Sequence, residues 1–186
     1  MYSKHLHALK LKLLSLGSLR PAAWQLLLQQ LCYTALKKGE SFNRKPGEMA
    51  WLATGLLKEY SALNRRKPVI INFLSANDCL ITRNINRYYY LKACTDTELY
   101  SIGFEQLVIL GRQYPELWPI YQRLCAAYDE GQEFRLMLLE ENSATTRIEL
   151  MMERYQQQLP FLSKKELCSY VHLNYDYFCL LFAKLR

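Results

Sequence analysis

The sequence lacks the signatures of a membrane protein, of a metalloprotein and of the common enzyme classes. Its 186 residues contain no apolar run of the roughly 18–20 residues that a transmembrane helix needs. Six cysteines are scattered without a CxxC pair, and the three histidines do not stand at metal-ligand spacing to them. There is no Gly-rich phosphate loop, no nucleophile-elbow motif and no evident pair of carboxylates. We therefore expect no enzyme, no cofactor, no metal site and no membrane contact.

The N-terminus resembles a signal peptide at first sight, but we do not expect it to be one. The first 21 residues, MYSKHLHALKLKLLSLGSLRP, are basic and then leucine-rich. Lys10 and Lys12 interrupt the apolar stretch, however, and no small-residue cleavage site follows it cleanly. We interpret this segment as an amphipathic helix of a cytoplasmic protein.

The composition is that of a folded globular protein, with 51% hydrophobic and 22% charged residues. The length suits one large domain or two small ones. The net charge of +7 is unevenly distributed: residues 1–100 hold 15 basic and 6 acidic residues, whereas residues 101–186 hold 9 and 11. This excess of positive charge is compatible with nucleic acid, with an acidic partner or with solubility alone, and does not choose among them.

The predicted secondary structure changes along the chain, from helices to short strands and back to helices. Helices are expected over residues 3–16 and 21–36, where Pro21 suits a first helical turn. Beyond Gly39, short β-type runs recur about every ten residues between turns, which indicates an antiparallel sandwich or roll. These runs are AWLATG, LLKEYSAL, VIINFL, YYYLKAC and TELYSI. The remainder reads as helical, so the predicted fold class is α+β.

Residues 115–142 form the longest predicted helix. Apolar and small residues recur there at alternating steps of three and four, which keeps them on one side of a helix. They are Leu117, Ile120, Leu124, Ala127, Gly131, Phe134 and Leu138. The pattern is typical of a dimer seam in which small residues let two backbones approach, and equally of a core helix with a wide apolar stripe. The spacing alone leaves both interpretations open.

Two short helices are predicted at the C-terminal end of the sequence, over residues 163–171 and 175–186. Ser163 with Glu166 forms an S-x-x-E capping box that starts the first helix, and only three residues separate the two. This arrangement is typical of a DNA-binding helix-turn-helix, in which the second helix presents its N-terminal residues to the major groove. Ordinary helical hairpins have the same spacing.

The order of these parts resembles that of the Crp/Fnr family of bacterial transcription regulators, and in particular its short Bacteroidetes-type members. The resemblance covers roughly residues 10–180 and rests on KKGE, GEMAWLATGLLKEYS, VIINFLSAND, CTDTELYSIGFEQLVILGRQYPELWPIYQRL and LSKKELCSYVHLN. It implies a jelly-roll β-roll like a cyclic-nucleotide-binding domain, with flanking helices, in residues 1–114. It further implies a connecting and dimerisation helix in 115–142, a DNA-binding helix-turn-helix domain in 143–186, and a homodimer.

The segment that would bind a cyclic nucleotide departs from the family pattern. In the family, glycine lets backbone N–H groups approach the phosphate and an arginine neutralises it. The matching window, NDCLITRNINRYYYLKA, has no glycine and no glutamate, so we expect no tight binding of cyclic AMP. Arg83 and Arg87 either face another anion or are solvated, and Tyr89 either lines the roll or packs in the core. These three residues are the candidates for binding an unidentified small ligand in the β-roll.

The helix-turn-helix departs from the family pattern as well. His172 replaces the usual turn glycine, and Cys179 and Leu180 replace a Ser-Arg pair that contacts DNA. The remaining candidates for DNA contact are Lys164, Lys165, Asn174, Tyr175, Tyr177, Lys184 and Arg186. The sequence thus predicts a dimeric Crp/Fnr-like transcription regulator that does not respond to cyclic AMP. The alternative is a degenerate relative that senses a ligand or associates with proteins without specific DNA binding.

Overall fold

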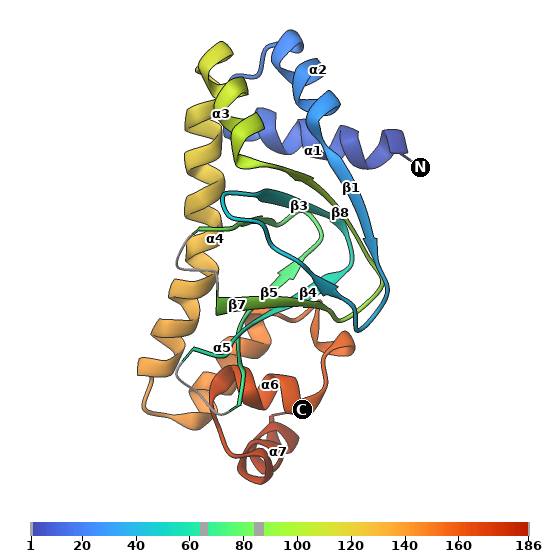
Figure 1. The fold of residues 1–186 in the computed structure, drawn as a ribbon. Helices are drawn as coiled ribbons and strands as arrows, with labels where there is room; N and C mark the ends of the chain where they lie inside the picture. The colour runs from blue at the N-terminus through green and yellow to red at the C-terminus, as the bar shows by residue number, and fades with distance from the viewer. Residues whose placement is uncertain (1, 64–66, 84–87, 186) are drawn as a thin grey trace.

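The protein is an α+β molecule in which two four-stranded antiparallel sheets form a roll with helices at both ends (Figure 1). The computed structural model describes residues 2–63, 67–83 and 88–185. The strands are β1 (Cys32–Leu36), β2 (Ser41–Phe42), β3 (Met49–Thr54), β4 (Leu56–Ser61), β5 (Val69–Ser75), β6 (Cys79–Ile81), β7 (Tyr89–Ala93) and β8 (Thr97–Ile102). The helices are α1 (Tyr2–Leu16), α2 (Pro21–Gln30), α3 (Phe104–Gln113), α4 (Leu117–Glu140), α5 (Ala144–Arg154), the short 3₁₀ helix η2 (Leu159–Phe161), α6 (Lys164–Val171) and α7 (Tyr175–Lys184).

The strand orders β1–β8–β3–β6 and β2–β7–β4–β5 define a jelly roll. The chain passes from the first sheet to the second between β3 and β4, at Gly55, whose φ is +91°. A Cβ at this position would lie 2.6 Å from the carbonyl oxygen of Asp96, so the turn requires glycine both for its backbone angle and for the space. The predicted break between two short strands at this glycine is thus the point where the chain changes sheets.

One core fills the roll and extends into the helices above it. Trp51 and Leu80 from the first sheet and Leu57 and Leu91 from the second belong to this core, each at most 1% exposed. Leucines and a tryptophan from α1 and α2 belong to the same core. Each Å² of apolar surface removed from water contributes about 25 cal/mol to stability. This contiguous cluster is therefore the main stabilising element of the N-terminal half.

A second core lies on the outer face of the second sheet. Leu56 of β4 and Phe73 of β5 point away from the roll and pack against the C-terminal helices, which lie below the sheets in Figure 1. Phe73 contacts the ring of Tyr170 on α6 at a centroid distance of 5.2 Å. A hydrogen bond of 3.2 Å from the Ile70 N–H to the Ser169 hydroxyl joins α6 to the edge of β5. The C-terminal helices are thus docked on the roll.

Helix α4 runs along one side of the molecule and contributes to both cores (Figure 1). The residues it buries recur at steps of three and four: Ile120, Leu124, Tyr128, Gly131, Arg135 and Leu138. The first of them belong to the roll core and Leu138 belongs to the C-terminal core. The first half of α4 therefore packs in the roll core and its end packs in the C-terminal core.

Most sequence-based element predictions agree with the structure, and one helix is wrong. The predicted helix over residues 21–36 ends at Gln30, and the following Cys32–Leu36 segment is β1, paired antiparallel with β8. No Gly or Pro separates helix from strand here, so the change depends on pairing with a strand more than sixty residues away. The short strands β2 and β6 were also missed. Among the described residues, none of the helices is long and apolar enough to cross a membrane.

Candidate DNA-binding helices and ligand pocket

The two C-terminal helices have the local geometry that the sequence predicts. The Ser163 hydroxyl accepts a hydrogen bond from the Glu166 N–H, and Glu166 accepts one from the Ser163 N–H at 2.7 Å, which completes the capping box at the start of α6. The helix ends at His172, which adopts the left-handed conformation with φ 55° and ψ 47°. Asn174 then caps α7 by accepting from the Asp176 N–H at 2.9 Å. A three-residue turn between two capped helices is the shape of a helix-turn-helix.

The candidate DNA-contacting side chains are exposed wherever the structure describes them. Helix α7 buries Phe178 and Phe182 against the C-terminal core, and its first turn and its outer side remain open. Asp176 and Leu180 share this open surface, and Leu180 is 57% exposed. The exposed candidates are Lys164, Lys165, Asn174, Tyr175, Tyr177 and Lys184, whereas Arg186 lies outside the described residues.

Helix α6 is held against the rest of the molecule by buried polar contacts as well as by packing. Arg135 of α4 donates a hydrogen bond from Nε to the Tyr170 carbonyl oxygen at 3.1 Å. The hydroxyls of Tyr155 and Tyr170 lie 3.1 Å apart, and burial raises the pKa of Tyr170, which keeps it neutral. On the sheet side, Lys58 of β4 forms an ion pair with Glu166. The first helix of the pair is therefore fixed to the roll, and the second presents the open surface.

Four of the seven residues predicted as a dimer seam are buried within the chain itself. A partner helix cannot reach these four residues in this fold, because the protein's own cores already cover them. Gly131 makes room for Asn72 of β5, because a Cβ there would lie 2.8 Å from the Asn72 amide nitrogen. Of the seven residues, Ile120, Leu124, Gly131 and Leu138 are buried, Leu117 and Phe134 are half-buried, and Ala127 is exposed.

A buried ion-pair network occupies the interior of the roll next to the segment that matches the phosphate cassette. Arg44, from the loop before β3, forms an ion pair with Glu59 of β4, with side chains 5% and 0% exposed. The Tyr128 hydroxyl donates to Glu59 at 2.5 Å and accepts from Arg44 at 2.8 Å. The guanidinium also donates to the Ile81 carbonyl oxygen and the Thr82 hydroxyl, each at 3.1 Å. Burial, together with the charge of Glu59, raises the pKa of Tyr128, so this tyrosine is neutral.

The structure describes two of the three predicted ligand-binding residues, Arg83 and Tyr89. Both terminal nitrogens of Arg83 donate to the Asp129 carboxylate of α4 at 2.9 Å, in a partly exposed pair. Tyr89 is half-buried at the start of β7, and Arg87 lies outside the described residues. The sequence analysis missed Arg44, Glu59 and Tyr128. One signal was available: strand alternation places Glu59 on the same face as the inward-facing Leu57, where a carboxylate needs a buried partner.

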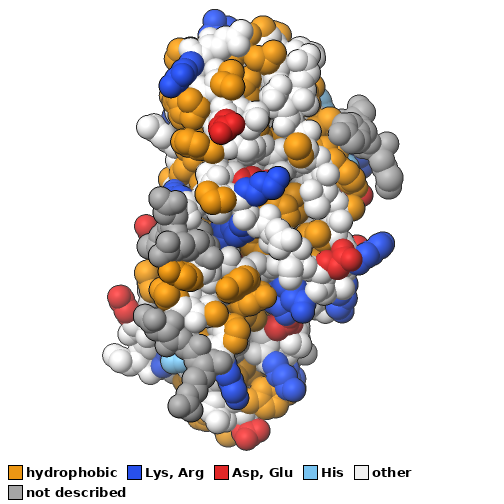
Figure 2. Space-filling view, viewed as in Figure 1, with side chains coloured by type: hydrophobic (Ala, Val, Ile, Leu, Met, Phe, Trp, Pro, Cys, Tyr) orange, Lys and Arg blue, Asp and Glu red, His pale blue; other side chains and the backbone are white. Residues whose placement is uncertain are grey.

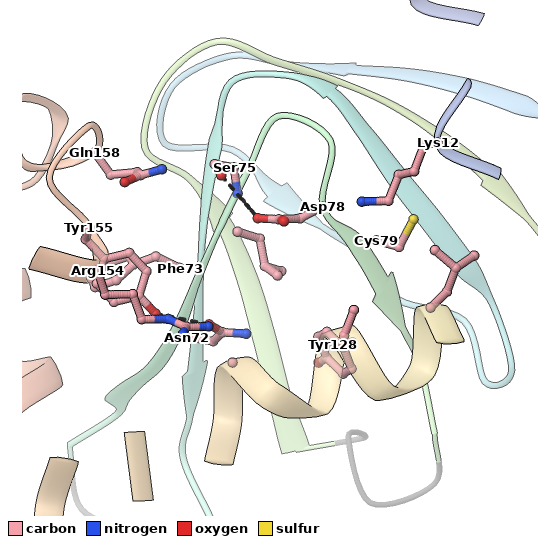
Figure 3. Close-up of a pocket in the computed structure, with 14 residues that line it drawn as sticks. Lys12, Asn72, Phe73, Ser75, Asp78, Cys79, Tyr128, Arg154, Tyr155 and Gln158 are labelled. Atoms are coloured by element: carbon pink, nitrogen blue, oxygen red, sulfur yellow. Dashed lines mark hydrogen bonds between the residues drawn. The ribbon is translucent and has the colours of Figure 1, made fainter. Parts of the chain in front are cut away.

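A separate pocket of about 330 Å³ opens between α4, the turn joining β5 to β6, and the end of α5 (Figure 3). Lys12 of α1 reaches it from one side, and Arg154 and Gln158 reach it from the opposite side. Asn72 and Asp78 lie between these groups. Among the described residues no group of His, Cys, Asp and Glu side chains could hold a metal ion.

Solved structures share this architecture at low sequence identity. FixK2 from Bradyrhizobium japonicum has a TM-score of 0.71 at 14% identity, with 83% of this chain and 84% of that chain covered. A transcriptional regulator of the Crp/Fnr family from Eubacterium rectale has a TM-score of 0.70 at 14% identity, over 89% and 83%. CLP, a c-di-GMP responsive global regulator from Xanthomonas campestris, has a TM-score of 0.65 at 14% identity, over 89% and 91%.

These similarities concern the fold alone, because no family model and no curated protein matches the sequence. The chain therefore has the fold of a CRP-like cyclic-nucleotide-binding domain followed by a C-terminal helical region.

Proposed function

We propose that this protein is a transcription regulator of Crp/Fnr type that acts as a homodimer and binds DNA through α7. The observation that carries the proposal is the capped pair α6–α7, whose second helix keeps its N-terminal turn exposed on a roll-and-long-helix fold shared with such regulators. Lys164, Lys165 and Lys184 lie exposed on these helices. In Figure 2, Lys and Arg side chains lie over the second sheet and the C-terminal helices, with a few Asp and Glu side chains among them.

The regulator is proposed to be independent of cyclic nucleotides. A nucleotide phosphate needs backbone N–H groups and an unpaired cation. Here the Arg44 guanidinium is already neutralised by Glu59, and the Arg83 guanidinium is paired with Asp129. A nucleotide entering the roll would have to displace the network around Tyr128. The protein's own side chains thus take up the position that a ligand's polar groups would occupy.

Dimerisation is proposed to use the outer side of α4, opposite the buried stripe. Trp118, Leu136 and Met137 are 37%, 60% and 49% exposed there. Exposed apolar side chains of this size on a long helix are typical of a contact with a second helix. Gln122 and Glu133, both exposed, lie between the two apolar ends.

The test of DNA binding is fluorescence anisotropy with the DNA upstream of the protein's own operon, at low salt, where counterion release most favours binding. We expect binding by the wild type and at least a tenfold weaker affinity for Lys164→Glu combined with Lys165→Glu, about 1.4 kcal/mol. The matched control, Lys4→Glu with Lys45→Glu, changes two exposed lysines far from α7 and should leave the affinity within a few-fold. Cyclic AMP should change neither affinity. Failure of the wild type to shift the DNA at low salt would refute the proposal.

A second candidate function is association with another protein instead of DNA. The observation that favours it is the apolar and acidic character of α7, where Leu180 is 57% exposed and Asp176 stands in the first turn. An exposed leucine cannot neutralise a phosphate, and an aspartate repels one. If the wild type fails to bind DNA while Leu180→Lys disrupts a complex isolated from its host cells, this second function is favoured.

A further inference from the structure

The pocket between α4, the β5–β6 turn and the end of α5 is separate from the roll interior and from the predicted ligand residues. Arg83 and Tyr89 do not line it. Tyr128 marks the boundary, since it lines the pocket while its hydroxyl is bonded to Glu59 and Arg44 inside the roll. Two further walls come from helices outside the roll, namely α1 with Lys12 and α5 with Arg154 (Figure 3).

The floor of the pocket is a buried carboxamide held in place by its neighbours. Asn72 is 2% exposed and accepts a hydrogen bond from the Tyr155 hydroxyl at 3.4 Å. The amide lies against α4 at Gly131, where even a methyl group would come within 2.8 Å of it. Close packing fixes the orientation of this amide, so it presents its polar atoms to a bound molecule in one defined way.

A second carboxamide contributes an acceptor that lacks a donor. The side-chain oxygen of Gln158 is buried and has no hydrogen-bond partner among the described residues. Buried polar atoms are almost always hydrogen-bonded in native proteins, to protein, to water or to a ligand. Gln158 lines the pocket, so a molecule there that carries a hydroxyl or amino group would satisfy this oxygen.

The charges around the pocket favour an anion. Two cations, Lys12 and Arg154, line it together with one carboxylate, Asp78. The Arg154 guanidinium lies 4.4 Å from the centroid of the Phe134 ring, a cation–π contact that holds it in position. Asp78 is fixed by the Ser75 N–H at 2.7 Å and its hydroxyl at 3.1 Å. Burial raises the pKa of Cys79 to about 12, so this lining thiol is neutral and adds no negative charge.

We infer that this pocket binds a small organic anion, with a carboxylate or phosphate at Arg154 and hydroxyl or amino donors at Asp78 and Gln158. The volume of about 330 Å³ lies at the lower end of the roughly 300–1,000 Å³ typical of small-molecule sites. This size suits a single metabolite, such as an amino acid, a hydroxy acid or a nucleoside monophosphate, and not a dinucleotide.

A ligand in this position bridges the two cores. Asn72 and Tyr128 belong to the roll and α4, whereas Arg154 and Gln158 belong to the C-terminal region. A molecule that contacts both sides binds the docked arrangement of the C-terminal helices and stabilises it by mass action. The inference goes beyond DNA binding and can be tested without DNA.

The experiment is isothermal titration calorimetry of the full chain with three probes: L-glutamate, citrate and adenosine 5′-monophosphate. We expect at least one probe to bind with a submillimolar Kd and to raise the melting temperature. Arg154→Gln should weaken that binding at least tenfold, and Arg112→Gln, which removes an exposed arginine on α3 far from the pocket, should leave it unchanged. Binding of L-glutamate or citrate would indicate recognition of a carboxylate, and binding of adenosine 5′-monophosphate would indicate recognition of a phosphate.

A second variant separates a loss of binding from a loss of the fold. Gln158→Leu removes the unpartnered oxygen, and it should leave the melting temperature of the free protein the same or higher while weakening the probe's binding. The inference is overturned if none of the three probes binds the wild type. It is also overturned if binding is equally strong in the Arg154→Gln and Gln158→Leu variants, because the ligand would then lie elsewhere.

Discussion

At two sites in this chain, the residues present are not those that local packing and backbone rules favour. Arg44 and Glu59 are buried as an ion pair in the roll, where large apolar side chains would pack without desolvating a charge. His172 adopts a left-handed conformation that glycine would take without steric cost. Both sites lead to stability predictions, because the structure gives the ion-pair partners of the first and the backbone angle of the second.

Removal of Arg44 should be strongly destabilising. Arg44→Met leaves the Glu59 carboxylate buried without its cation, and we expect a loss of about 3–5 kcal/mol in the free energy of unfolding. Combining it with Glu59→Gln removes the orphaned charge, so the double variant should be more stable than Arg44→Met alone. Urea unfolding monitored by circular dichroism measures both. Equal stability of the single and double variants would show that the carboxylate is not ionised in the folded roll.

The backbone at His172 gives a prediction of opposite sign. A non-glycine residue in the left-handed region costs about 1–2 kcal/mol, whereas glycine costs roughly 0.5–1 kcal/mol in chain entropy. We therefore expect His172→Gly to be at least as stable as the wild type, and His172→Val to be destabilised by about 1–2 kcal/mol, because a branched Cβ fits this region worst. Thermal unfolding of the three proteins tests the order. A destabilised glycine variant would mean that the imidazole makes a stabilising contact.

At the scale of elements, the sequence predicts what is local and misses what depends on distant pairing. The strand break at Gly55, the capping box at Ser163 and the long helix over residues 115–142 follow from residue types and spacing. The strand at 32–36 does not, because its pairing with β8 is made by distant residues. The apolar stripe of α4 was predicted correctly as a stripe, but spacing cannot distinguish a partner helix from the protein's own roll.

The two sides of α4 should respond differently to charge. Leu136→Asp with Met137→Asp changes two exposed side chains, and we expect it to weaken the proposed dimer at least tenfold while the fold persists. Leu138→Asp, one residue further, buries a carboxylate in the C-terminal core and should unfold that region, since Leu138 is 0% exposed. Analytical ultracentrifugation and circular dichroism separate these effects. A dimer that survives the outer-face double substitution would place its interface elsewhere.

At the scale of the whole molecule, helix α4 contributes to both hydrophobic cores, and the C-terminal helices pack on the outer face of the second sheet. That docking was not predictable from the sequence. Leu56, Ile70 and Phe73 alternate with inward-facing residues, which shows that both faces of β4 and β5 are apolar, but the pattern does not say what covers the outer face. The ligand pocket was missed for the same reason, because its lining comes from α1, β5, α4 and α5 and meets only in the folded chain.

The docking contact should weaken in acid. The Lys58–Glu166 ion pair joins β4 to α6. Partial burial works to raise the pKa of Glu166, but the hydrogen bonds from Lys58 and Ser163 outweigh it and leave this pKa below its ordinary value of 4.5. A carboxylate with a lowered pKa in the folded state contributes stability above its unfolded pKa, and that contribution is lost as the pH falls through the folded pKa.

Glu166→Gln should therefore be less stable than the wild type at neutral pH, and the difference should shrink as the pH falls below about 4.5. The measurement is the free energy of unfolding from urea titrations across this range, with Glu130→Gln, an exposed substitution on α4, as the matched control. The same variant should make the amides of α6 exchange hydrogen faster at neutral pH, because the helix is held to the sheet less firmly. A stability difference that does not vary with pH would mean that the charge of Glu166 does not contribute to holding the C-terminal helices on the roll.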